Sequence, residues 1–183
     1  MKKQRIILVT SGIFFFFLSL PSKSYGQQHT VDAGLRFQKA VGLYYENGLT
    51  AQYNYSRRWV FGVSYITSRL GSASRSNAIK QDNFLISGAY LFKAAAALNP
   101  FVRANTGYFR ADYETEIFNR LPKSSVLLSA DAGLMYRFKF PLKMNVSIGY
   151  NAITGDGESG PGTLYPLFYQ LSALWNLGKH QAK

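Results

Sequence analysis

The sequence of 183 residues contains no cysteine and only two histidines, and it has 9 acidic residues against 21 Lys and Arg. The absence of cysteine excludes a disulfide scaffold, a cysteine-ligated zinc or iron–sulfur site and a thiol nucleophile. Two histidines leave little for a His-rich metal site. Charged residues make up only 16% of the chain, below the usual quarter of a soluble domain. We expect no metal, no cofactor and no catalytic residue.

Long apolar runs are also missing, except for one at the N-terminus. Residues 6–20 are apolar and follow three basic residues, Lys2, Lys3 and Arg5. The run is 15 residues long, short of the roughly 20 that a membrane-spanning helix needs. Small residues stand three and one positions before Gln27, which is typical of a signal-peptide cleavage site. The sequence predicts a cleaved signal peptide over residues 1–26, with an uncleaved anchor as the alternative.

Removal of this segment takes four basic residues with it and lowers the formal net charge from +12 to +8. A basic cytosolic chain would suggest a nucleic-acid partner. An exported chain does not normally meet nucleic acid, so we expect lipid phosphate or a surface polysaccharide as the anionic partner.

Alternation of apolar and polar residues with period two dominates the rest of the chain and predicts β-strands. One face of each strand is apolar and uncharged, whereas the opposite face carries Asp32, Arg36, Arg103, Asp131 and Arg137. The eight predicted strands cover residues 30–38, 48–55, 59–67, 83–92, 101–110, 126–138, 144–150 and 165–177.

The connections between these strands alternate in length, which is typical of outer-membrane barrels. Residues 56–58 and 139–143 are short links, and 93–100 is intermediate. The longer links are 39–47, 68–82, 111–125 and 154–164. Strands of this length match a tilted crossing of the bilayer core. The fold class is therefore all-β, an eight-stranded antiparallel up-and-down transmembrane β-barrel over residues 27–178, with a short basic tail at 179–183.

Aromatic residues on the apolar face lie near the strand ends, where they would form two interfacial girdles. The girdle on the short-turn side comprises Tyr55, Trp59, Tyr90, Phe92, Phe101, Tyr136, Phe138 and Trp175. The girdle on the long-loop side comprises Tyr65, Tyr108, Tyr150 and Tyr165.

The interior of an eight-stranded barrel is filled by side chains, so we expect no open pore. Inward charges must then pair with one another, because an unpaired buried charge is costly. We expect a structural network that joins the inward charges to three polar residues. Its members are Asp32, Arg36, Arg103, Asp131, Arg137, Gln52, Gln170 and Asn145.

Basic residues also occupy the long loops, where they would meet lipopolysaccharide phosphates at the outer rim through charge-assisted contacts. The alternative is that they only keep the loops soluble. These residues are Arg69, Arg75, Lys80, Arg110, Arg120 and Lys123. A second basic set, in the short turns, would lie near inner-leaflet headgroups: Arg57, Arg58, Lys93, Lys139 and Lys143.

The signal peptide, eight strands and alternating loops resemble the small outer-membrane β-barrels of the OmpA-transmembrane/OmpX type. The resemblance implies an outer-membrane location, insertion by the barrel-assembly machinery and a monomer, but no specific activity. Such proteins often end on an aromatic residue that this machinery recognises, whereas here a basic tail follows Leu177. We therefore expect an internal assembly signal around residues 168–177.

The sequence favours a structural or surface-binding role, with an unknown extracellular ligand for the long loops and no catalysis. A lipid A-modifying barrel enzyme would be a competing function, but such enzymes use a histidine. His29 and His180 both lie outside the predicted strands, on the periplasmic side. The same sequence is also compatible with a soluble periplasmic lipid-binding barrel, and with a small component of a surface secretion or conjugation complex.

Overall fold

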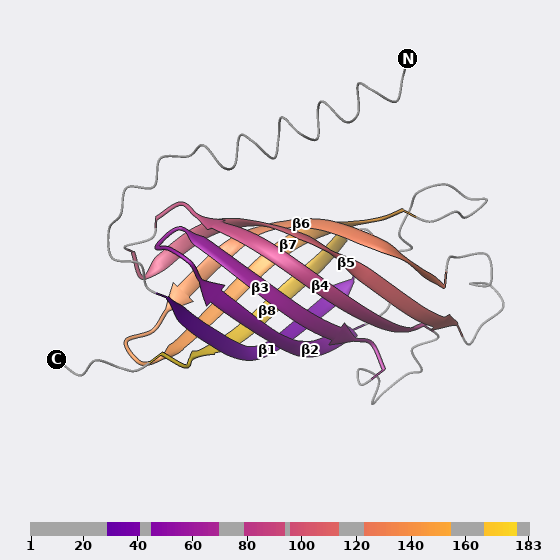
Figure 1. The fold of residues 1–183 in the computed structure, drawn as a ribbon, viewed down its shortest axis with the longest axis horizontal. Coiled ribbons are helices and arrows are strands. Elements are labelled where there is room, and N and C mark those ends of the chain that lie inside the picture. The colour runs from indigo at the N-terminus through magenta and orange to yellow at the C-terminus, as the bar shows by residue number, and fades with distance from the viewer. Residues whose placement is uncertain are drawn as a thin grey trace, which may run out of the picture.

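The computed structural model describes residues 29–40, 45–69, 79–93, 96–113, 123–154 and 167–178. These residues form a closed antiparallel barrel in which each strand pairs with the next and β8 pairs with β1. The strands run obliquely to the long axis of the barrel (Figure 1). They are β1 Thr30–Ala40, β2 Tyr45–Asn54, β3 Trp59–Thr67, β4 Ile79–Leu91, β5 Leu98–Tyr113, β6 Ser124–Arg137, β7 Leu142–Thr154 and β8 Leu167–Asn176.

The two ends of the barrel differ in their connections. At one end, which we call the short-turn end, residues 55–58, 92–97 and 138–141 join neighbouring strands. β1 begins and β8 finishes at this same end. The opposite end, which we call the loop end, carries the connections 41–44, 68–78, 114–123 and 155–166.

The alternation of apolar and polar residues in the sequence corresponds to side chains that point alternately out of the barrel and into its lumen. Outward side chains such as Leu49 and Ile86 are 63% and 64% exposed, although they are large and apolar. Inward side chains such as Asp32 and Arg36 are polar, yet they are 0% and 1% exposed. The predicted eight-stranded antiparallel barrel, with its apolar face outward, is confirmed. Within the residues described, no helix combines the length and the apolar character needed to cross a membrane.

The strands extend further toward the loop end than the sequence predicts. The predicted long link 39–47 is wrong, because β1 continues to Ala40 and β2 begins at Tyr45. In the added stretch of β2, Glu46 pairs with Gln38 on β1, and both side chains are buried in the lumen. β4 and β5 likewise continue beyond the predicted limits, with Ile79 paired to Tyr113. The links 68–82 and 111–125 are shorter than predicted for the same reason.

One predicted girdle residue points the wrong way. Phe101 shares its facing with Arg103, two positions on along β5, so its ring lies inside the barrel and is only 3% exposed. The Arg103 guanidinium carbon lies 5.3 Å from the centre of this ring. The other described girdle residues face outward, and Tyr165 lies outside the described residues.

The lumen contains two apolar clusters, one toward each end of the barrel, along the β3–β6 side. The cluster toward the loop end comprises Ile66, Leu85, Phe109, Ala111 and Leu127. The cluster toward the short-turn end comprises Val60, Ala89, Leu91, Phe101 and Met135. Leu85 and Leu91 therefore account for the partly apolar inner face of β4. Between and beside these clusters the lumen is lined by polar and charged side chains.

Candidate functional site

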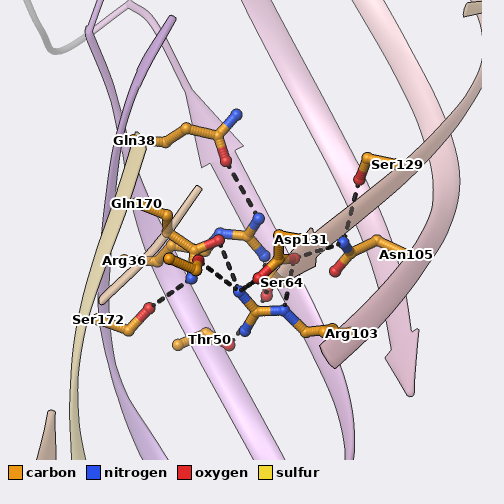
Figure 2. Close-up of polar contacts among 11 residues, drawn as sticks. Arg36, Gln38, Thr50, Ser64, Arg103, Asn105, Ser129, Asp131, Gln170 and Ser172 are labelled. Carbon is orange, nitrogen blue, oxygen red and sulfur yellow. Dashed lines mark hydrogen bonds and ion pairs between the residues drawn. The ribbon is translucent and has the colours of Figure 1, made fainter. Parts of the chain in front are cut away.

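A buried ion pair lies at the centre of the polar lumen. Arg103 on β5 donates from Nε to Asp131 Oδ2 at 2.9 Å and from Nη2 to Asp131 Oδ1 at 2.7 Å. Nη2 also donates to Gln170 Oε1 on β8 at 2.8 Å, so the guanidinium spans the lumen (Figure 2). Asn105 donates to Asp131 Oδ2 at 3.1 Å. The carboxylate is thus held by a bidentate arginine and an amide, the geometry that makes a charge-assisted pair strong.

Arg36 lies beside this pair but contacts neutral groups. Its Nη2 donates to Gln38 Oε1 at 3.1 Å (Figure 2). Gln38 in turn donates to Glu46 Oε2 at 2.8 Å, and Asn83 donates to Glu46 Oε1. Arg36 and Glu46 therefore interact through an amide bridge and not by direct contact. This chain of hydrogen bonds runs through the lumen from its centre toward the loop end.

A third cluster surrounds Asp32 at the short-turn end. Lys143 donates from Nζ to Asp32 Oδ2 at 2.6 Å, although the two residues stand on β7 and β1. Asn54 donates to the same oxygen at 2.8 Å, and Asn176 donates to Oδ1 at 2.6 Å. Arg137 is half-buried and interacts electrostatically with Asp32. This cluster fills the lumen where the first and last strands meet.

The structure brings the five predicted lumen charges into the barrel interior but divides them among these clusters. Of the three polar residues expected with them, Gln170 contacts Arg103. Gln52 Oε1 and Asn145 Oδ1 are buried without a hydrogen-bond partner. These hydrogen bonds place the predicted charges in groups at different depths of the lumen, and a network that joins all eight residues stays a prediction.

Sequence reasoning misses two charged members of the lumen. Glu46 falls in a predicted loop, although its position keeps the period-two facing of β2 once the strand is extended. Lys143 falls in a predicted short turn near headgroups. It is instead directed inward to Asp32, at the start of β7.

The predicted outer-rim cations fall at the loop end where the structure describes them. Arg69 follows β3 and donates to Asp82 at 2.9 Å and to Asp112 at 3.4 Å. The hydrogen bond to Asp82 raises the pKa of the Arg69 guanidinium above its ordinary value. Arg110 on β5 pairs with Asp82 on β4, and Lys80 lies two residues further along β4 toward the loop end. Lys123 precedes β6, and Arg75 and Arg120 lie outside the described residues.

Outward aromatic rings mark the two ends of the apolar band. Toward the short-turn end Trp59 contacts Tyr90 with ring centres 5.2 Å apart, and Tyr136 contacts Phe138 at 4.7 Å. Toward the loop end Tyr65 and Phe84 lie 5.0 Å apart. Rings of this kind favour the headgroup level of a bilayer, where one edge is apolar and the other is wet.

The described part of the chain has few side chains arranged for catalysis. No cluster of three or more His, Asp or Glu with the spacing of a metal site occurs among the residues described. His29 lies at the short-turn end, where its ring stacks on Tyr53 and hydrogen-bonds the phenol oxygen. His180 lies outside the described residues.

Comparisons with known proteins identify the fold. No protein-family model matches the chain, and no curated protein does either. Among solved structures, the N-terminal β-barrel domain of Pseudomonas aeruginosa OprF matches with a TM-score of 0.63 and 13% identity, over 82% of this chain and 98% of that one. P. aeruginosa outer membrane protein H matches with a TM-score of 0.57 and 14% identity, over 81% and 99%.

Neisserial surface protein A matches with a TM-score of 0.53 and 18% identity, over 80% of this chain and 93% of that one. At such identities the likeness shows the fold alone. The chain therefore has the fold of small eight-stranded outer-membrane β-barrels, and the resemblance expected from the sequence is confirmed at that level.

Proposed function

We propose that the chain is an integral outer-membrane β-barrel with a structural or surface-binding role, and with neither an open channel nor catalytic activity. The observation that carries the proposal is the facing of the strands. Large apolar side chains cover the outside, including Val63 at 57% exposed and Val146 at 58%. A soluble protein rarely exposes a contiguous apolar surface of this extent, whereas a bilayer solvates it.

The directions in which the side chains point argue against a soluble ligand-carrying barrel. Such a carrier needs an apolar lumen and a polar outside, and the described residues have the reverse arrangement. The lumen carries Asp131, Arg103 and Arg36, each 5% exposed or less. Transport of an apolar ligand past these charges would have to break a paired and desolvated site, which costs several kcal/mol.

The same side chains support the proposed absence of an open channel. Arg103 bridges β5, β6 and β8 across the lumen, and the apolar clusters fill space to either side of it. Planar-bilayer recordings of the purified protein should show no stable open level. A regular unitary conductance in the wild type would contradict this part of the proposal.

The rim supports the surface-binding part of the role. Arg69, Lys80 and Arg110 lie together at the loop end, next to outward aromatic rings. Phosphates of lipopolysaccharide occupy this level of an outer membrane, and guanidinium groups bind phosphate through charge-assisted hydrogen bonds. Binding of this kind weakens as salt screens the charges.

The test compares binding of purified lipopolysaccharide to the wild type and to R69Q/R110Q in phospholipid nanodiscs. A matched control, R57Q/K139Q, removes two positive charges at the short-turn end. We expect the rim variant to lose about tenfold in affinity, since a hydrogen bond to a charged group contributes about 1.5–3 kcal/mol, and the control to bind like the wild type. Equal binding by all three proteins would contradict the surface-binding role.

A further inference from the structure

The outer surface of the barrel is hollowed over β1–β5. This hollow has a volume of about 900 Å³ and is lined almost entirely by apolar atoms. Its floor is formed by the small outward side chains Ala33 and Ala51. Its walls are larger outward side chains, among them Leu49, Phe84 and Ile86. The volume lies within the roughly 300–1,000 Å³ typical of small-molecule sites.

The strand register places the hollow in one half of the apolar band. Ala33 pairs with Ala51, which pairs with Val63, and all three residues of this row line the hollow. The next row toward the loop end, also part of the hollow, comprises Leu35, Leu49, Tyr65, Phe84 and Tyr108. The hollow therefore approaches the loop end with a row rich in aromatic rings.

The row beyond these rings is polar. Thr67 pairs with Asp82, and Asp82 pairs with Arg110, one step along the same strands β3–β5. Lys80 pairs with Asp112 one step further out, and Arg69 reaches both acidic side chains. Three cations and two carboxylates thus border the outer end of the hollow, which leaves a net positive charge there.

An apolar hollow that ends on a positive border fits an amphipathic anion whose polar end lies at the loop end. We propose that the hollow binds acyl chains of an anionic, multiply acylated glycolipid of the outer leaflet, with a glycolipid phosphate at Arg110. The ligand class is lipid A. This inference rests on the proposed function, because it assumes that the loop end faces the outer leaflet.

Charge favours the glycolipid over a second copy of the chain. Two copies that met through their hollows by a two-fold axis along the membrane normal would have the same orientation in the bilayer. Their positive borders would then adjoin, and like charges in contact are unfavourable. The phosphate of a glycolipid instead neutralises the border, while the acyl chains of the same molecule pack closely against the small side chains of the floor.

The test measures lipid A bound to the folded protein by mass spectrometry of intact complexes released from mild detergent. Three probes are compared: hexa-acylated lipid A, the same molecule without its phosphates, and phosphatidylcholine. Ala51→Leu fills the floor of the hollow without adding a polar atom. Ala130→Leu is the matched control, because Ala130 faces outward on β6, away from the hollow. Arg110→Gln removes the proposed phosphate contact.

We expect the wild type to prefer intact lipid A over both other probes. A51L should weaken binding of intact lipid A by about fivefold, because close packing supplies the attraction between surfaces within a bilayer. R110Q should weaken it by about tenfold and should remove the preference for the phosphorylated form. A130L should bind like the wild type. A heat-dependent gel shift of each variant confirms that it has folded.

The outcomes separate the two proposals. If R110Q loses binding and A51L does not, the hollow is not the chain site, although the rim still binds phosphate. If neither variant differs from the wild type, both proposals are wrong. If dimers appear in the spectra and vanish in A51L, the hollow is a contact between copies, and the lipid assignment is overturned.

Discussion

Arg103 and Asp131 are both almost completely buried, so each depends on the other for its charge to be tolerated in the lumen. Removing one partner of such a pair leaves an uncompensated buried charge, whose cost exceeds the net value of the intact pair. Asp131 accepts two hydrogen bonds from Arg103 and one from Asn105, so its carboxylate depends strongly on these partners for stabilisation.

Arg103→Met should therefore lower the free energy of unfolding by about 3–5 kcal/mol, measured by urea titration of the protein in lipid vesicles. Arg103→Met with Asp131→Leu should recover most of this loss, because no charge remains unpaired. A double variant that is as unstable as the single one would show that the arginine acts through packing and not through its charge.

Gly149 shows how little room the lumen leaves. A Cβ at this position would lie 2.2 Å from Cζ of the Phe168 ring and 2.7 Å from Cβ of Asp131. Overpacking of this kind typically costs about 1–3 kcal/mol. We expect Gly149→Ala to destabilise the barrel by about 2 kcal/mol, and Phe168→Leu to relieve most of that cost in the double variant. Unfolding titrations of the four proteins test the coupling, and additive costs would contradict the contact.

At the scale of single strands, facing decides what a substitution costs. Ile148 and Ala152 both point outward from β7, Ile148 within the apolar band and Ala152 nearer the loop end. On a lipid-facing surface the cost of arginine depends on depth. Ile148→Arg should cost about 2–4 kcal/mol and Ala152→Arg about 0–1 kcal/mol, measured by chemical unfolding in bilayers. Equal costs at the two sites would contradict the assignment of a membrane midplane to Ile148.

The number of strands and their facing were predictable, since period-two alternation survives wherever one face meets apolar surroundings and the other a polar lumen. The strand ends were not, because the contrast disappears above the apolar band. There Lys80, Asp82 and Arg110 face outward, while β5 turns the apolar Phe109 and Ala111 into the lumen and the ladder continues. Pairing with a neighbouring strand, which no single segment encodes, holds these ends in place.

The partners within the lumen were less predictable than the strands. Asp32 and Lys143 are 111 positions apart in sequence and meet across β1 and β7. Which inward residues share a depth depends on the stagger of the whole barrel, and this is a property of closure. The outward facing predicted for Phe101 was wrong for a simpler reason. Phe101 is two residues from the inward Arg103 on the same strand, so both side chains must lie on the lumen face.

For the whole molecule, the N-terminal segment makes a separate prediction. Residues 1–26 lie outside the described residues, and the case for their removal rests on the apolar run and the small residues before Gln27. Intact mass spectrometry of the protein from membranes should give the mass of residues 27–183. A mass that includes residues 1–26 would show that the segment is retained as an anchor.

The facing of all eight strands implies that lipid or detergent must cover the apolar outside of the folded molecule. In a closed barrel every strand is paired with two neighbours, so there is no unpaired edge strand from which unfolding in detergent could begin. The folded form should therefore resist SDS at room temperature and change its gel mobility only after boiling.

The most direct measurement is this mobility shift in fractionated cells, comparing boiled with unboiled samples of the outer-membrane and soluble periplasmic fractions. We predict that the protein is found in the outer-membrane fraction and that its band moves on boiling. A soluble periplasmic protein whose band is the same before and after boiling would contradict it, because the exposed apolar face would then be covered by something other than lipid.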